Sequence, residues 1–417
     1  MLDFGKAVKN FLFRTIGLPD ESDIITCKAL IQFNRLSKIF IPSARIEHEG
    51  NKDELRRKIR LENLFLRTCI IFTIFRINVS LFVDNYYIDL FLANPFSGNK
   101  STKGFFFLIQ VDLVFICLFV LREYCLHLEE TGRFKVFRVF HHISKNGLSR
   151  VSLGLSYRQC KKFHKTIHNM MFHSIRIILI TTILMTISVM ALKVHNFSST
   201  FIHLIFILVY TPIECVSAIP MFVNVMCYTM YCGSYLALNL SRFNTLQEII
   251  KKNSLTISYN CTALRLMNNR VVYFLNHFDR IDSYWKYLFQ CYFIVVLPAD
   301  FGLFFAIILD FDSDILSLIT ALNSIIVHIA VIASYYWFSH FYHETIDMHK
   351  RYVSIILHSG SASLVDKLKA LEILDRTGSP HIGVSIGDFC RLKRSTCIFY
   401  LLENASFLML LTCNIRV

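Results

Sequence analysis

Seven runs of apolar residues, each about the length of a membrane-crossing helix, alternate along the chain with polar segments. A crossing helix needs about 20 mostly apolar residues to span the ~30 Å of hydrocarbon in a bilayer. The predicted spans are 64–83, 104–122, 169–192, 201–222, 287–308, 315–338 and 396–413. The fourth run stays apolar to about Leu238, so its helix is expected to continue beyond the bilayer. The pattern predicts an all-α membrane protein with seven transmembrane helices.

The composition agrees with a chain that lies largely in lipid. Hydrophobic residues make up 54% of the sequence and charged residues only 18%, and there are 39 Phe. Soluble domains contain about a quarter charged residues, which excludes a soluble protein of this size. The segment 1–63 holds 12 basic and 9 acidic side chains without a long apolar run, so a cleavable signal peptide is not expected.

The basic residues gather on one side of the predicted membrane. Of the 44 Lys and Arg residues, 36 fall in four segments that share a side: 1–63, 123–168, 237–286 and 339–395. Only 4 fall in the segments of the other side. Because Lys and Arg are enriched in cytoplasmic segments, the N-terminus is predicted to be cytoplasmic and the C-terminus extracellular. This placement accounts for the net charge of +14 without a nucleic-acid partner.

The segment 339–395 contains an amphipathic helix, predicted over residues 363–376. Ser363 with Asp366 three residues later resembles a capping box, and Gly378 supplies a stop. The apolar residues that recur at helical spacing are Leu364, Leu368 and Leu371. We expect this helix to pack against the cytoplasmic extensions that follow span four and precede span five, which would form an anchor layer.

Ionisable residues inside the spans are the first candidates for a functional site, because they are costly in hydrocarbon. Arg76 in span one and Asp112 in span two lie at matching depths below the outer surface, which predicts an ion pair between them. The pair could serve a ligand pocket or be purely structural.

A second group of candidate pocket residues lies in spans five and six. Asp300 follows Pro298, and the aromatic side chains of Tyr292 and Phe304 lie on the same span. His328 in span six is expected at the next level inward. An aromatic cavity with one carboxylate suits a small-molecule ligand. Alternatively, Asp300 accepts a hydrogen bond between helices, a role that Glu214 fits equally well.

The seventh span carries the candidate residues for ion conduction. One helical face holds Thr396, Tyr400, Glu403 and Phe407, with Asn404 beside it. Four copies of Glu403 would form a carboxylate ring that favours cations. The alternative for Glu403 is an ion pair with Arg391 or Lys393 below the span.

Motifs for catalysis are absent from the sequence. It contains no phosphate-binding loop, no nucleophile elbow and no pair of catalytic carboxylates. His340-Phe-Tyr-His343-Glu344 does not have the HExxH spacing of zinc enzymes. We therefore predict no catalytic residues, no metal site and no cofactor, and we do not expect an enzyme.

The layout of the chain resembles that of the invertebrate gustatory and odorant receptor superfamily, with the nematode gustatory-receptor-like and serpentine class r proteins nearest. The resemblance in layout covers nearly the whole chain, and the local match lies at its end. Gly383 to Asp388 occupies the position of a Gly-to-Asp stretch in those receptors. Ser406-Phe407 to Thr412 occupies that of a Thr-Tyr pair and its apolar run, with Cys413-Asn414 in place of Gln-Phe.

The resemblance implies a chemosensory receptor subunit in the plasma membrane. It implies a tetramer that forms a ligand-gated, nonselective cation channel, with a pocket in the outer half of the bundle and the last helix around a central pore. One alternative is a G-protein-coupled chemoreceptor, which requires the opposite orientation. Another is a non-conducting scaffold or a secondary transporter, although the inverted repeats typical of transporters are not evident.

Overall fold

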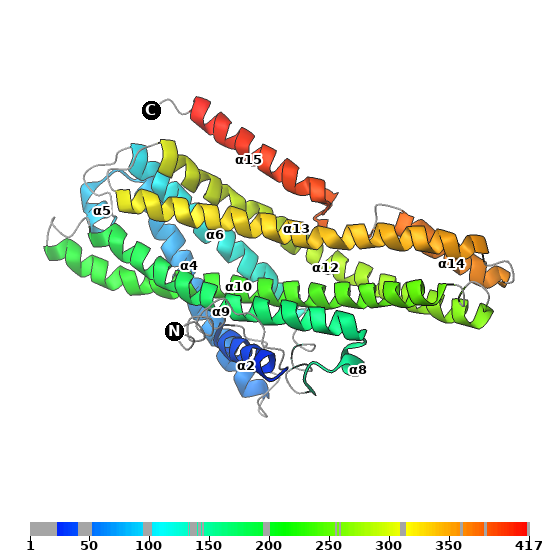
Figure 1. The fold of residues 1–417 in the computed structure, drawn as a ribbon. Coiled ribbons are helices and arrows are strands. Elements are labelled where there is room, and N and C mark those ends of the chain that lie inside the picture. The colour runs from blue at the N-terminus through cyan, green and yellow to red at the C-terminus, as the bar shows by residue number, and fades with distance from the viewer. Residues whose placement is uncertain are drawn as a thin grey trace, which may run out of the picture.

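Long helices make up nearly all of the structure, a computed structural model that is all-α apart from two very short strands (Figure 1). It describes residues 23–40, 52–94, 102–131, 133, 140, 143, 146–194, 201–254, 257, 260–308, 314–358, 362–378 and 382–414. The elements are α2 (Asp23–Phe40), α4 (Lys52–Phe82), α5 (Tyr86–Phe91), α6 (Thr102–Glu130), α8 (Arg150–Leu153), α9 (Tyr157–Val194), α10 (Phe201–Lys252), α12 (Cys261–Ile308), α13 (Asp314–His358), α14 (Leu364–Gly378), β1 (Ser385–Ile386), β2 (Cys390–Arg391) and α15 (Arg394–Asn414).

Each of the seven predicted spans coincides with part of one of these helices, and only Val83, the last residue of the first span, lies just past the end of its helix. Four helical segments in the described ranges are long and apolar enough to cross a membrane: Arg57–Phe82, Leu204–Lys252, Thr320–His358 and Arg394–Asn414. A shorter apolar segment, Val296–Phe305, lies in α12. The helical class and these apolar helices are compatible with a membrane protein, whereas seven crossings and their orientation stay predictions.

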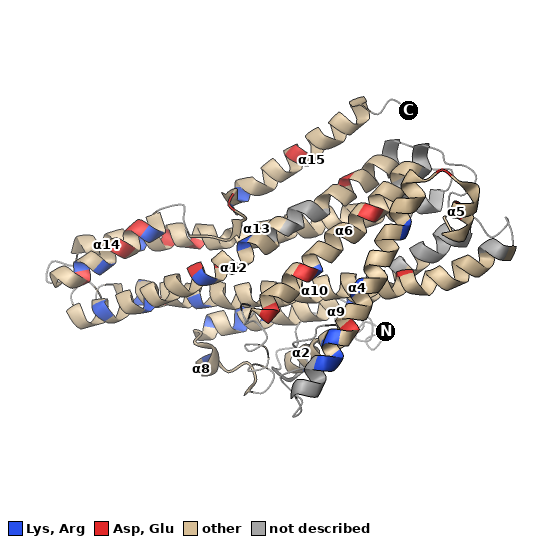
Figure 2. Cartoon of the chain, turned by 180° about the vertical axis from the view of Figure 1, so that it is seen from behind, with Lys and Arg blue, Asp and Glu red and all other residues tan. Residues whose placement is uncertain are grey.

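Charged side chains are unevenly distributed over the length of the molecule. Figure 2 shows Lys and Arg along α14, on the neighbouring part of α12 and at the foot of α4, and few at the end that holds α5. The end with α14 is the one that the charge count assigns to the cytoplasm.

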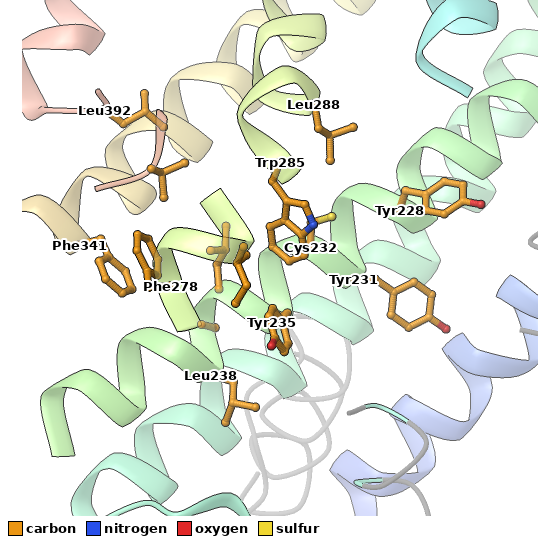
Figure 3. Packing of buried hydrophobic residues seen from close by; sticks show 14 of the residues in the cluster. Tyr228, Tyr231, Cys232, Tyr235, Leu238, Phe278, Trp285, Leu288, Phe341 and Leu392 are labelled. Atoms are coloured by element: carbon orange, nitrogen blue, oxygen red, sulfur yellow. The ribbon is translucent and has the colours of Figure 1, made fainter. Parts of the chain in front are cut away.

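The anchor layer is built from helices that continue past the predicted spans. It consists of α14 and of the parts of α10, α12 and α13 beyond the spans, within 237–252, 261–286 and 339–358. Stacked aromatic rings join the three long helices. Phe243 lies 5.2 Å from Phe274 and 5.6 Å from Phe341 between ring centres. Phe278 and Phe341 are 4.1 Å apart and point toward one another in Figure 3.

The helix α14 folds back from α13 and runs parallel to α12. Arg265 Nε and Asp366 Oδ1 are 3.1 Å apart, and Arg376 Nη2 and Asp279 Oδ2 are 2.6 Å apart. Asn268 also donates to the Asp366 carbonyl at 3.0 Å. In both ion pairs the α14 residue comes about 100 positions after its α12 partner. Residue numbers therefore rise in the same direction along the two helices. The predicted partner before span five is confirmed, and α13 is a second partner of α14.

The prediction that the leucine face of α14 is buried was wrong. Leu364, Leu368 and Leu371 are all exposed. The buried residues of α14 are Asp366, Ala370, Ile373 and Thr377. Small side chains let the α14 backbone approach its neighbours closely, and the Asp366 carboxylate is satisfied by Arg265, which also lowers the pKa of that carboxyl. Polar pairing, rather than the leucine pattern, therefore decides which face is buried.

The N-terminal segment contributes α2, which the sequence analysis did not expect. Ser37 Oγ lies 2.6 Å from the Tyr231 hydroxyl, and Asn224 Nδ2 donates to the Phe40 carbonyl at 2.9 Å. Phe33 is fully buried against the Tyr231 ring. These contacts attach α2 to α10, and α2 also packs on α9.

The start of α14 carries the predicted capping box. The Asp366 amide donates to Ser363 Oγ at 3.2 Å, and that hydroxyl donates to Asp366 Oδ2 at 2.6 Å. We predict that Ser363→Ala lowers the free energy of unfolding by about 1 kcal/mol, because an orphan amide loses its acceptor. Ser363→Asn should retain most of the stability. Denaturant unfolding in lipid nanodiscs measures both, with Ser354→Ala on the exposed face of α13 as the control. Equal stability of Ser363→Ala and wild type would contradict the cap.

Candidate functional site

The last helix follows a hairpin, formed by β1 and β2, that is bound to α12. β1 and β2 pair antiparallel, with Ser385 opposite Arg391. The Gly387 amide donates to the Lys286 carbonyl at 2.8 Å, at a φ of 53° that favours glycine. Lys286 Nζ and Asp388 Oδ1 are 2.6 Å apart. Their interaction raises the pKa of Lys286 and lowers the pKa of Asp388, and so favours the charged form of both.

A second contact of the hairpin with α12 is made by Asp282. Its carboxylate accepts from the Ser385 amide at 2.9 Å and from the Ser385 hydroxyl at 2.6 Å. Burial raises the pKa of Asp282, and the two hydrogen bonds from Ser385 oppose that shift. The stretch from Gly383 to Asp388 is therefore the segment that positions the start of α15.

Above the hairpin, three polar side chains connect α12, α13 and α15. Asp300 on α12 is only 2% exposed, and its Oδ1 lies 3.4 Å from His328 Nε2 on α13. His328 Nδ1 lies 2.7 Å from the Tyr400 hydroxyl on α15. If the Tyr400 hydroxyl donates to Nδ1, the imidazole proton is on Nε2 and faces Asp300. We call these three residues the polar bridge.

The surroundings of the polar bridge are mostly aromatic. Phe304 is fully buried one turn after Asp300, and the Tyr335 ring meets the Tyr400 ring edge-on at 5.7 Å. Gln110 from α6 donates to the Pro298 carbonyl at 3.3 Å. Asp300 Oδ1, His328 Nε2 and Gln110 Oε1 are buried atoms that form no hydrogen bond within the described part of the chain. Such atoms are costly in an apolar interior, and they mark this region as a place for a further polar group.

The structure brings together some of the predicted pocket residues and separates others. Asp300 and His328 lie in contact as expected, and Phe304 lies one turn after Asp300 on α12. The side chain of Tyr292 lies outside the described residues. Arg76 and Asp112 do not form the predicted ion pair.

The partner of Arg76 is Glu214 on α10. Its guanidinium forms an ion pair with the Glu214 carboxylate and donates to the Leu92 carbonyl at 2.7 Å. It also lies 4.9 Å from the centre of the Tyr210 ring. Asp112 instead accepts from Asn78 Nδ2 at 3.0 Å. The matching depths of Arg76 and Asp112 correctly gave their level along the helices. Depth does not give the direction of a side chain, and Arg76 points to the side of α4 on which α10 packs.

The predicted pore-lining residues of α15 are divided between two environments. Thr396 and Tyr400 are buried against the helix bundle. Phe407 is half-buried, and its ring meets that of Phe301 at 6.0 Å. Asn404 donates to the Tyr400 carbonyl at 2.6 Å and is half-buried. Glu403 is exposed.

Glu403 lies at the edge of a cavity between α12, the hairpin and α15. The cavity has a volume of about 1280 Å³ and is lined by both charged and aromatic side chains. Neither Arg391 nor Lys393 forms an ion pair with Glu403, and no other described residue does so. Tyr400 lines the cavity and also belongs to the polar bridge. A pore-lining role for the α15 residues stays a prediction.

Several contributors to these sites were missed in the sequence analysis. Gln110 and Tyr335 carry no charge and lie in apolar runs, where a search for ionisable residues passes over them. The only signal for the hairpin in the sequence was the Gly387-Asp388 pair, which favours a turn. Among the described residues, no group of three or more His, Cys, Asp or Glu side chains is placed to hold a metal ion.

Comparisons with known proteins add no identification to this geometry. The chain matches no protein-family model and no curated protein sequence. Inference about function therefore rests on the chain's own residues and on the resemblance in layout described above.

The buried pair of Arg76 and Glu214 permits a direct test of the corrected pairing. We predict that Glu214→Gln lowers the free energy of unfolding by about 3–5 kcal/mol, because it leaves a buried guanidinium without a counter-charge. Asp112→Asn should cost less than about 1 kcal/mol, since an amide oxygen still accepts from Asn78. Denaturant unfolding in nanodiscs measures both variants. A cost for Asp112→Asn as large as that for Glu214→Gln would contradict the assignment.

Proposed function

We propose that the chain is a chemosensory receptor subunit of the gustatory type. In this proposal it crosses the plasma membrane seven times with its N-terminus in the cytoplasm. It assembles as a tetramer, and binding of a small-molecule ligand opens a nonselective cation pathway along α15. The resemblance in layout to gustatory and odorant receptors supplies the receptor class.

The single observation that carries the proposal is the polar bridge. Asp300 and His328 belong to the helices of the candidate ligand pocket, and Tyr400 belongs to the terminal helix. A ligand that approaches Asp300 or His328 would compete for the contact with the Tyr400 hydroxyl. Binding could then be transmitted to α15, because the two arrangements differ in the contacts that the ligand makes.

The exposure of α15 supports a role in assembly. Ile398, Phe399, Leu402 and Leu410 are exposed large hydrophobic residues of this helix. Such a surface must contact lipid or other subunits, because large apolar patches are rarely exposed to water. Glu403 is exposed at the edge of the face that packs against the bundle, so in a tetramer it would reach a central axis from that edge.

Orientation separates this proposal from a G-protein-coupled receptor. We predict that a glycosylation site engineered at residue 5 stays unmodified in cells, while one added at the C-terminus receives a glycan. The basis is the concentration of Lys and Arg at the α14 end. A mobility shift that is removed by glycosidase measures each site, and the two sites act as each other's control. A glycan at residue 5 would contradict the channel proposal and favour the G-protein-coupled alternative.

Conduction is tested by whole-cell recording in heterologous cells exposed to a panel of tastants. We predict a ligand-dependent cation current whose reversal potential moves toward that of chloride in Glu403→Gln, because the carboxylate ring is lost. Tyr400→Phe should shift the half-maximal ligand concentration by about two- to tenfold, the size of one hydrogen bond. Asp375→Asn removes an equal charge from the exposed face of α14 and should change neither quantity.

The recordings have clear adverse outcomes. An unchanged reversal potential in Glu403→Gln would remove Glu403 from the pathway. Wild-type sensitivity in Tyr400→Phe would remove the polar bridge from gating. No current under any tastant, alone or with related subunits, would favour a silent or metabotropic role.

A further inference from the structure

The helix α2 lies at the level where the predicted spans meet the cytoplasm. The Phe40 carbonyl accepts from Asn224 Nδ2 at 2.9 Å, two residues past the end of span four. Toward the other end of α2, Thr26 Oγ1 lies 3.2 Å from His168 Nδ1, one residue before span three. Tyr231, a partner that lies farther inward, is nine residues past span four. At ~1.5 Å per residue, these partners of α2 lie between about 2 and 14 Å inward of the predicted boundaries. The helix therefore crosses α9 and α10 beside the inner surface of the predicted membrane.

The two sides of α2 differ in chemical character. One side packs on the bundle and is buried, and it consists of Thr26, Ala29, Leu30, Phe33 and Ser37. The other side is open and carries two cations and two large apolar residues, Lys28, Ile31, Arg35 and Ile39. No carboxylate occurs among residues 24–40. Ile39 is 60% exposed. Isoleucine beside Lys and Arg on the open side of a helix is typical of helices that lie in a membrane interface.

The neighbouring helices add positive charge near the same level. Figure 2 shows Lys and Arg at the foot of α4. Four further exposed cations, three on α4 and one on α9, lie just before spans one and three: Arg57, Lys58, Arg60 and Lys165. No described carboxylate forms an ion pair with any of these four cations or with the two cations of α2. On the described parts of α4, α6 and α9 near the boundary, the exposed carboxylates are Glu62 and Glu130. We call the six exposed cations the basic rim, and positive charge predominates there.

The level and the charge of the basic rim together select its partner. The cytoplasmic leaflet carries anionic lipids, and its negative surface potential attracts Lys and Arg that lie close to it. That attraction falls off within a Debye length, which is about 8 Å at physiological ionic strength. An acidic soluble protein would also suit the cations, but it would not account for the exposed Ile31 and Ile39. Apolar side chains beside cations fit the boundary between headgroups and acyl chains.

We propose that α2 is an interfacial helix that binds anionic lipids of the inner leaflet. Lys28 and Arg35 contact the lipid headgroups, and Ile31 and Ile39 lie at the boundary with the acyl chains. The opposite side of α2 is bound to α9 and α10. Lipid composition would therefore act on the inner ends of two predicted spans. The inference rests on the spans of the proposed function but not on conduction or on a ligand, so it is tested on purified protein without currents.

The test places the full chain in nanodiscs of phosphatidylcholine, with and without phosphatidylserine. We expect a photoactivatable phosphatidylserine to crosslink to α2 and to the foot of α4. The double variant Lys28→Gln/Arg35→Gln should weaken this binding by about twentyfold, as expected for two cations at a membrane surface. Lys28→Arg/Arg35→Lys keeps both charges and should bind nearly as wild type does, which separates loss of charge from loss of folding.

A matched control removes two exposed cations of the anchor layer. Lys251 and Arg270 lie 29 residues past span four and 17 residues before span five. At ~1.5 Å per residue these positions are more than about 25 Å from the boundaries, well beyond a Debye length. Lys251→Gln/Arg270→Gln should therefore bind phosphatidylserine as wild type does.

Hydrogen–deuterium exchange of α2 tests its contact with the membrane in the same nanodiscs. We expect exchange of its backbone amides to slow severalfold when phosphatidylserine is present. Ile39→Gln should speed exchange in both kinds of nanodisc, because a polar side chain replaces an apolar one at the boundary with the acyl chains. On a helix that faces water, the same substitution of an exposed isoleucine would have little effect.

Four results would overturn the proposal. The first is equal phosphatidylserine binding by wild type and Lys28→Gln/Arg35→Gln. The second is equal labelling of α2 by a photoactivatable phosphatidylcholine. Complete competition by soluble glycerophosphoserine at matched concentration is the third, because it would assign the basic rim to a free phosphate compound. The fourth is exchange of α2 that changes neither with phosphatidylserine nor in Ile39→Gln, because it would assign the open side of α2 to water. Both leaflets of a nanodisc have the same lipids, so these outcomes are independent of orientation in cells and of whether the chain conducts.

Discussion

The attachment of α14 and the hairpin to α12 determines where the last helix begins, and both candidate sites depend on it. Asp366 binds Arg265 and Asn268, and Ser385 binds Asp282 farther along the same helix. These contacts follow α12 toward the predicted membrane in steps that keep the two segments parallel. Polar groups that must be satisfied thus place Tyr400 at the level of His328. These contacts fix the start of α15, and the rest of the helix touches α12 on one side. The cavity is the space that remains between the two helices.

Much of the helical architecture could be predicted from the sequence, because hydropathy reports burial in lipid over stretches of about 20 residues. The cap at Ser363 and the contact of Asp300 with His328 could also be predicted, from local chemistry and from depth. Depth gives a level along a helix but not the direction in which a side chain points. That is why Arg76 was assigned to Asp112 when α10 offers Glu214. For α14, the leucine spacing indicated burial, whereas the packed face is set by a satisfied carboxylate and small side chains.

The two candidate sites are connected through a single residue. Tyr400 forms part of the polar bridge with its hydroxyl, and it is also one of the residues that line the cavity. A ligand at Asp300 or His328 would therefore act on a residue that also borders the cavity. The buried atoms Asp300 Oδ1, His328 Nε2 and Gln110 Oε1, which form no hydrogen bond within the described part of the chain, are consistent with a site that trades stability for binding.

The parallel run of α14 beside α12 has a consequence for how the protein can change. The ion pairs and hydrogen bonds described above between α12 and α14, and between α12 and the hairpin, all involve residues before Arg394, the first residue of α15. The outer surface of α15 contributes little to that frame, since Ile398, Leu402 and Leu410 are exposed. Exchanges between apolar residues there should therefore change the packing of a single chain little. The terminal helix can diversify in sequence while its position stays constant, so new specificities can arise on an old scaffold.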